Sequence, residues 1–435
     1  MRRWPGRTPT WVDKVVFVAL MSGPPKFRDR DINASLTGQI DWVVLLHIAV
    51  WGGGALWVLT RLFPFLRRGL IPSVSGVQIV GALLIAGLTL SLWHSPGVML
   101  TTFMLGQFTI MLCFAWLFID RFGPSVFLRY LFVGVCVVTV ALLLTALLDP
   151  EMVISGEQGR FRGERIASTG ALALMGLVFC LSDVPRLRSV AFWGSVALFG
   201  ALLVTSRMRT AYVGMIVYLA FGCVFGRRLR VRRLVPLLLV LSIGLVLVDA
   251  STKTVDYMVR DTKSIETMSD RIPLWRHLTK TVMREEPVIG FGYYAASRII
   301  APQYNPRLGT AHSTFFEFLV GGGIVGATLY LFLCASLVWY SARLLAAAGG
   351  QPESVTAVGL LLVALVLGVS SSEAAHSGPV GFGFWSMTAL LPALLRRAAT
   401  RAVPHVDRRH VRSMVAPPRL SPQRTALPRS RSRRA

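Results

Sequence analysis

Apolar runs of about 16–25 residues recur along almost the whole chain, the length that a helix needs to cross a hydrocarbon core of roughly 30 Å. A membrane β-barrel would instead show alternating segments of about ten residues. The pattern therefore predicts an all-α polytopic membrane protein. The composition agrees with this prediction, because 54% of the residues are hydrophobic.

Twelve spans are predicted, and the first is a short run near residues 11–22. This run follows a basic N-terminus and contains no small-x-small cleavage site, so we do not expect a cleaved signal peptide. The other spans are predicted at Trp42–Thr60, Val74–Trp93, Val98–Phe118, Phe127–Leu148, Ala167–Leu181, Ser189–Thr205, Thr210–Phe225, Leu234–Val248, Ser313–Tyr340, Val355–Ser371 and Val380–Leu395.

The positive charges are distributed as in a membrane protein rather than as in a nucleic-acid-binding domain. The net charge is +25, but many arginines lie in the tail or in short loops between apolar runs. With twelve spans and both termini in the cytoplasm, the arginine-rich alternate loops all face the cytoplasm. We therefore expect a multi-pass protein of the cytoplasmic (inner) membrane, with a transmembrane domain over 1–398, a large extracytoplasmic loop at 251–312 and a basic disordered tail at 399–435.

No metal centre or cofactor is assigned from the sequence. The five cysteines lie inside apolar runs without metal-site spacing, which is typical of packing residues. Asp29 and Asp31 in the first outer loop could hold a divalent cation beside a phosphate, but a solvated loop has the same sequence.

Three predicted outer segments carry arginines against the orientation rule. Arg160 follows the fourth long apolar run, Arg209 starts a span, and Arg271 starts an amphipathic helix in the long loop. The guanidinium fork matches pairs of phosphate oxygens, and helix N-termini attract anions, so arginines that converge here would suit a diphosphate. The alternative partners are loop carboxylates and lipid headgroups.

The predicted amphipathic helix leads into a glycine-rich part of the chain. Trp275, Leu278 and Val282 share one face of this helix, and Pro287 ends it. The next span contains four glycines near its start, which would allow close helix packing or a bend. These glycines are Gly321, Gly322, Gly323 and Gly326.

His312 and Glu317 are the candidate acid–base residues. His312 precedes a predicted helix, where the positive helix end and nearby arginines disfavour an imidazolium ion. A neutral ring is the state that a general base needs, although a structural hydrogen bond is the alternative role. Glu317 lies inside a span, so it either serves function or pairs with an arginine or with backbone groups.

Five short motifs between Arg160 and about Gly326 carry a resemblance to a known family. They are the "RFRG" segment, the "MRTAY" turn with Arg209, the Arg-x3-Trp helix start, the "PVIGFG" turn, and "AHST" with His312 at the head of the Gly-rich span. In this order the chain resembles the O-antigen ligase/polymerase superfamily of bacterial membrane glycosyltransferases. It departs from that pattern at Ser168 and Thr169, where Pro-Asn is usual, and at Met208 and Ser313.

The resemblance implies a GT-C-like helical fold and transfer of a glycan from undecaprenyl diphosphate to an acceptor hydroxyl, with inversion and without a metal or nucleotide. Arg209 and Arg271 would hold the diphosphate, and Arg160 would support them. His312 would take the acceptor proton. The supporting residues would be Glu317, Arg276 and Trp275. Trp275, Tyr293 and Tyr294 could stack on sugars, although tryptophan also anchors proteins at interfaces.

The implied partners are a lipid-linked glycan donor, a glycan, lipid or surface acceptor, and the membrane, with no nucleic acid. A ligase and an exopolysaccharide polymerase of the cell envelope differ only in the acceptor, so both remain open. A polysaccharide or lipid flippase would place ionisable residues near the midplane of several spans, and a scaffold would not need outer arginines. Both of these alternatives rank below a glycosyltransferase of polysaccharide biosynthesis.

Overall fold

The computed structural model describes residues 8–23, 41–67, 74–148, 154–155, 160–161, 168–182, 184, 189–206, 208–225, 271–305, 309–372, 375 and 378–402. The predicted span Leu234–Val248, the Asp29–Asp31 loop and most of the predicted tail lie outside these residues.

The described elements are almost entirely helical. The helices are α1 (Trp11–Ser22), α3 (Trp42–Arg67), α4 (Gly76–Leu90), the 3-10 helix η1 (Ser91–His94), α5 (Val98–Phe122), α6 (Pro124–Leu148), α7 (Thr169–Leu181), α8 (Ser189–Ser206), α9 (Arg209–Phe225), α13 (Arg271–Glu285), α14 (Ala295–Tyr304), α15 (Thr314–Ala348), α16 (Pro352–Ser370) and α17 (Pro379–Ala402). Two short strands, β1 (Ile154–Ser155) and β2 (Arg160–Phe161), pair antiparallel.

The predicted class, an all-α polytopic membrane protein, is confirmed. Six helices among the described residues are long and apolar enough to cross a membrane, and three shorter apolar helices accompany them. The six are Trp42–Pro64, Gly76–His94, Val98–Phe122, Pro124–Leu148, Thr314–Ala348 and Pro352–Val369. The total of twelve spans stays a prediction.

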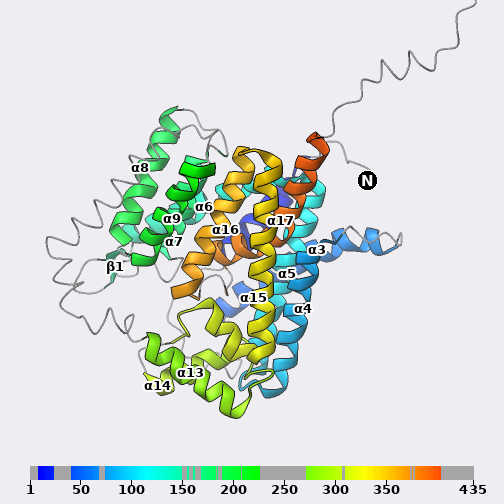
Figure 1. The fold of residues 1–435 in the computed structure, drawn as a ribbon, viewed down its shortest axis with the longest axis vertical. Coiled ribbons are helices and arrows are strands. Elements are labelled where there is room, and N and C mark those ends of the chain that lie inside the picture. The colour runs from blue at the N-terminus through cyan, green and yellow to red at the C-terminus, as the bar shows by residue number, and fades with distance from the viewer. Residues whose placement is uncertain are drawn as a thin grey trace, which may run out of the picture.

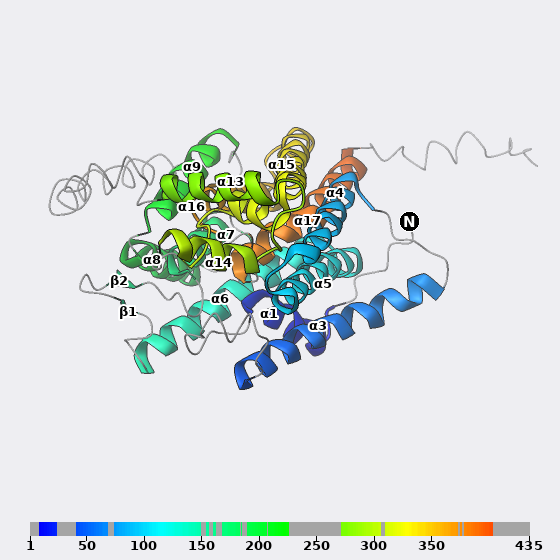
Figure 2. The same cartoon turned by 90° about the horizontal axis from the view of Figure 1, so that it is seen from below.

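The long helices form a bundle that is covered at one end by two amphipathic helices. In Figure 1, α4, α5, α15, α16 and α17 run along the long axis, while α7, α8 and α9 pack together at one side. The helices α13 and α14 lie against α15 at the end opposite to the last turns of α17, and Figure 2 looks onto this layer.

An aromatic cluster forms part of the core where α1, α5, α6 and α17 meet. Phe17 of α1 contacts Phe114, Phe118, Phe127 and Phe382 with ring centroids between 5.0 and 5.7 Å apart. Full burial of these rings removes a large apolar area from lipid or water. The short first helix is therefore packed into the bundle.

The helix α3 runs across the direction of α4 and α5 in both views (Figure 1, Figure 2). It is held to α1 through the buried carboxylate of Asp13, which accepts hydrogen bonds from Trp57 Nε1 at 2.8 Å and from Arg61 at 3.2 Å. Hydropathy thus predicted the helix at Trp42–Thr60, but the direction of the helix comes from these contacts and from its packing against α5.

The helix α15 is interrupted at Gly323, which has φ 59° and ψ −154°. The interruption frees two carbonyls and two N–H groups, and such groups need partners inside a membrane protein. The loop Pro287–Gly292 supplies all four partners. Phe291 N donates to Val320 O at 3.0 Å, Gly292 N to Gly321 O at 3.1 Å, Ile324 N to Pro287 O at 2.8 Å and Val325 N to Val288 O at 3.2 Å.

The close approach of loop and helix requires glycine on both sides. A Cβ atom on Gly290 would lie 2.5 Å from Gly323 N, and one on Gly323 would lie 2.5 Å from Val288 O. Both residues also have positive φ, where a side chain is strained. A bend, one of the two possibilities predicted for the glycine-rich span, is therefore present, and the "PVIGFG" turn fills it.

Candidate active site

His312 lies in the turn directly before α15, at the end of the bundle that α13 and α14 cover. Its φ of 50° is unusual for a residue other than glycine. The turn is fixed on both sides, because His312 N donates to Thr310 Oγ1 at 3.3 Å and Thr314 Oγ1 donates to Ser371 O at 3.0 Å. Contacts of this kind are what maintain a strained backbone at a functional position.

The imidazole of His312 is neutral near pH 7. Burial lowers its pKa from 6.5 to about 4, and the positive charges of Arg271 and Arg298 add to this effect. The neutral state expected from the sequence is thus present, although burial rather than the neighbouring charges is its main cause. These electrostatic interactions place Arg271 of α13, Arg298 of α14 and His312 before α15 in one site.

Arg271 is the first residue of α13 and is half-buried. Burial lowers its pKa, but an arginine keeps its proton at any pH at which the protein is folded. The helix forms where the sequence predicts it, from Arg271 to just before Pro287. Of the three residues predicted to share its apolar face, Leu278 and Val282 are fully buried.

Arg298 of α14 is a site residue that the sequence analysis did not identify. Its guanidinium carbon lies 3.2 Å from the centroid of the Tyr294 ring, and Nη1 donates to Tyr294 O at 2.8 Å and Ser297 Oγ at 3.2 Å. The available signal was an aromatic residue four positions before an arginine, a spacing that brings both onto one face of a helix.

Glu317 is buried and binds three parts of the site. Its carboxylate accepts hydrogen bonds from Ser297 Oγ at 2.7 Å and from Ala311 N at 3.2 Å, and lies 4.0 Å from Arg298 Nη1. Of the two roles open from the sequence, pairing with an arginine and with backbone groups is the one that the structure shows. The carboxylate thereby fixes the residue that precedes His312.

Trp275 holds the same residue from the other side. Its Nε1 donates to Ala311 O at 2.8 Å, and its ring stacks on Phe316 with centroids 4.9 Å apart. Both backbone groups of Ala311 are therefore bonded by side chains, one from α13 and one from α15. Trp275 thus helps to position the His312 turn.

The idea that Tyr293 stacks on sugars is wrong. Tyr293 is fully buried, and its hydroxyl donates to Ala375 O. Thr101 Oγ1 donates to Tyr293 O at 3.0 Å, and the Tyr293 ring stacks on Phe318. The turn with Gly292 directs this tyrosine into the bundle, where no sugar can reach it.

Residues 193–331 match the family model described as O-antigen ligase. The match supports the O-antigen ligase superfamily. The matched segment runs from α8 into α15 and includes Arg209, Arg271, Arg298, His312 and Glu317, so the site described above lies within it. No curated protein matches the chain. The finding supports a membrane enzyme of the O-antigen ligase/polymerase superfamily.

Two of the arginines that the resemblance to this superfamily singled out are described only by their backbone. Arg209 is the first residue of α9, and Arg160 lies in β2 opposite Ser155. The helix α9 begins at the His312 end of the bundle, because its last residue, Phe225, lies beside Gly350 at the opposite end (Figure 1). Arg276 is exposed on α13.

The start of α7 contacts the turn before α9, and the convergence of the arginines in these outer segments stays a prediction. Ser168 Oγ donates to Met208 Sδ at 3.2 Å, which joins the start of α7 to the turn before α9. A Cβ atom on Gly170 would lie 2.7 Å from Met208 Cβ, so the contact needs a glycine in the first turn of α7. Ser168 and Met208, two of the departures from the superfamily pattern, thus contact each other.

The described residues contain no cluster of three or more His, Cys, Asp or Glu side chains that could hold a metal ion. The absence of an assigned metal stays a prediction of the sequence analysis.

Proposed function

We propose that this enzyme transfers a glycan from undecaprenyl diphosphate to an acceptor hydroxyl at the outer face of the cytoplasmic membrane. The observation that carries the proposal is a neutral histidine beside two guanidinium groups, Arg271 and Arg298, at one end of a membrane helix bundle. A base next to an anion site is the combination that glycosyl transfer from a diphosphate needs.

In the proposed reaction the acceptor oxygen attacks the anomeric carbon of the donor sugar. A new C–O bond forms to the acceptor, and the bond from the anomeric carbon to the diphosphate oxygen breaks. The acceptor proton passes to the imidazole of His312, and the lipid diphosphate leaves with the electron pair. Arg271 and Arg298 stabilise its growing charge, and Arg209 and Arg160 are proposed to extend this anion site. Attack from the opposite face inverts the anomeric centre.

The low pKa of His312 in the free protein is compatible with the role of a base. Burial is the main cause, and the two neighbouring cations add to it. A bound diphosphate would neutralise the part of the shift that the cations cause, which makes the ring a better proton acceptor than it would be beside two unpaired guanidinium groups.

The test uses purified full-length protein in nanodiscs and radiolabelled lipid-linked glycan. We expect His312→Ala to bind the donor but to lose transfer by a factor of about 10²–10⁴, the usual contribution of general acid–base catalysis. Arg271→Ala should weaken donor binding as well. Normal transfer by a folded His312→Ala protein would refute the proposal.

The nature of the acceptor separates a ligase from a polymerase, and the match to the O-antigen ligase family model is compatible with both. A ligase attaches preformed chains to a lipid or surface acceptor, whereas a polymerase extends a lipid-linked chain. Chain length and the point of attachment in the products distinguish the two. The proposed location is the cytoplasmic membrane, with both termini in the cytoplasm.

A further inference from the structure

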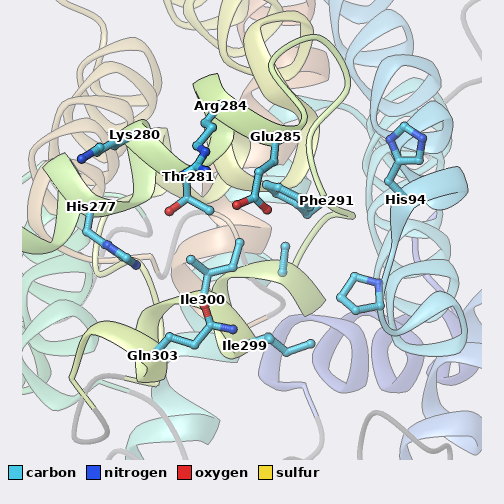
Figure 3. A pocket seen from close by; sticks show the side chains of 12 residues that line it. His94, His277, Lys280, Thr281, Arg284, Glu285, Phe291, Ile299, Ile300 and Gln303 are labelled. Atoms are coloured by element: carbon cyan, nitrogen blue, oxygen red, sulfur yellow. The ribbon is translucent and has the colours of Figure 1, made fainter.

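A concave site lies between α13, α14 and the turn from η1 to α5 (Figure 3). Its volume of about 500 Å³ is within the range of ligand pockets, which is roughly 300–1,000 Å³. We call it the α13–α14 groove, and define it by His94, His277, Thr281, Glu285, Phe291 and Gln303 in its lining. None of the four residues of the candidate active site, His312, Arg271, Arg298 and Glu317, lines this groove.

The α13–α14 groove has an apolar floor and a polar rim. Ala296 and Ile300 lie in the floor and belong to the small core beneath α13, where Leu278 and Val282 are fully buried. Lys280 and Arg284 of α13 line the rim. A pyranose ring has the same division, because its C–H face is apolar and its edge carries hydroxyl groups.

The rim contains both donors and acceptors of hydrogen bonds. Lys280 and Arg284 only donate, Glu285 only accepts when ionised, and Thr281 and Gln303 do both. A phosphate or another anion would be served by donors alone and would be repelled by Glu285. A hydroxyl group both donates and accepts, so the mixture fits a polyhydroxylated ligand better than an anion.

His277 is one of the residues that line the groove. Its Nε2 atom is buried and has no hydrogen-bond partner among the described residues. The ring contacts Tyr304, with centroids 5.5 Å apart, and the side chain points into the groove (Figure 3). Because this atom is buried, a ligand in the groove could bond it only after the imidazole rotates.

We propose that the α13–α14 groove binds a segment of a glycan chain at a distance from the reacting sugar. This role rests on the proposed function, because the chain would be the donor or acceptor glycan whose reacting end lies at His312. Binding at the groove would hold the glycan along α13 and α14 and so select chains of suitable sugars. The groove is therefore a specificity site and contains no catalytic residue.

The experiment measures binding directly, in the full-length protein in nanodiscs of phosphatidylethanolamine and phosphatidylglycerol. The probe is a mixture of oligosaccharides released by mild acid from the envelope of the source organism and labelled with a fluorophore. We expect Glu285→Ala and Gln303→Ala each to weaken binding severalfold, and the double variant to weaken it about tenfold, because each variant removes a hydrogen bond to the ligand. The matched control is Met283→Ala, an exposed residue of α13 outside the lining.

The outcomes separate this proposal from the proposed function. Equal binding by the wild type and the double variant, or no binding by the wild type, overturns the glycan site. Displacement of the probe by soluble glycerophosphoglycerol, but not by unlabelled oligosaccharide, would indicate a lipid headgroup and also overturns it. His312→Ala should bind the oligosaccharides normally, so a failure of transfer chemistry leaves the groove result intact.

Discussion

The two faces of the α13–α14 layer differ in how their polar groups are satisfied. On the face towards His312, the carboxylate of Glu317 and both backbone groups of Ala311 have partners within the protein. On the face of the α13–α14 groove, Lys280, Arg284 and Glu285 are exposed, and the Nε2 atom of His277 lacks a partner among the described residues. The first face has a fixed geometry suited to chemistry, and the second has free groups suited to a variable ligand.

The largest effect is expected from Glu317→Ala, which removes the central acceptor of the His312 face. Ser297 Oγ and Ala311 N, both buried, would lose their acceptor, which we expect to cost together about 2–6 kcal/mol of unfolding free energy. Thermal unfolding in detergent and the transfer assay would measure it. Glu317→Gln, which keeps one acceptor oxygen, should lose less. A Glu317→Ala protein as stable and active as the wild type would show that this face is not fixed as described.

A somewhat smaller effect is expected where loop and helix interlock. Gly290→Ala would add a Cβ atom 2.5 Å from Gly323 N at a residue with positive φ, and we expect a destabilisation of about 1–3 kcal/mol. The matched control is Gly106→Ala in α5, where no atom lies within 4 Å of the new Cβ and alanine favours the helix. Similar melting temperatures for the two variants would contradict the interlocked arrangement.

The pH dependence of the reaction should report the charges around His312. The free protein has a His312 pKa of about 4, so kcat/KM should fall only as pH decreases towards that value. Arg298→Gln removes a positive charge, which favours the imidazolium ion and raises the pKa. The acid limb of the profile should therefore move to higher pH. An unchanged limb would mean that Arg298 does not act on the ring.

The lowered pKa of His312 also determines how the stability of the folded protein changes with pH. The ordinary pKa of histidine is 6.5, so between pH 6.5 and about 4 the unfolded chain binds a proton at His312 that the folded chain does not. His312 thus makes the folded state less stable as pH falls through this window, and has no such effect above it. Denaturation of wild type and His312→Asn at pH 7.5 and 5 would show a smaller loss for the variant.

The smallest effect is expected from the pair that joins the η1 turn to the end of α13. His94 Nδ1 lies 2.7 Å from Glu286 Oε2, and both side chains are about one-third exposed. Polar side-chain pairs of this exposure contribute roughly 0–1 kcal/mol. Glu286→Gln should therefore change the melting temperature little, and a loss comparable to that of Glu317→Ala would reverse the contrast between the two faces.

The sequence predicted those parts of the fold and site that depend on local pattern. The amphipathic helix at Arg271, the bend at the glycines of α15 and the neutral state of His312 all follow from residues close together in the chain. The direction of α3 could not be predicted from the sequence, because hydropathy gives the length of this helix but not its orientation across the bundle (Figure 2).

Arg298 and Tyr293 show why the rest of the site could not be predicted. The role of Arg298 depends on α14 folding back so that Ser297 reaches Glu317, twenty positions along the chain. Tyr293 and Tyr294 are adjacent and equally aromatic, yet one is buried in the bundle and the other lies beneath a guanidinium group. Only the path of the glycine turn decides between them.

The interruption of α15 has a mechanical consequence. The Pro287–Gly292 loop is hydrogen-bonded to residues on both sides of Gly323. The loop therefore bridges the interruption of α15 and keeps it from acting as a hinge. From Ile324 to Ala348 the helix is long enough to cross the bilayer without its first turns. If a thinner or thicker bilayer tilts this part of α15, the layer above it must tilt as well. His312, α13 and α14 would then move together as one rigid body, and the distances between the residues of the site would not change.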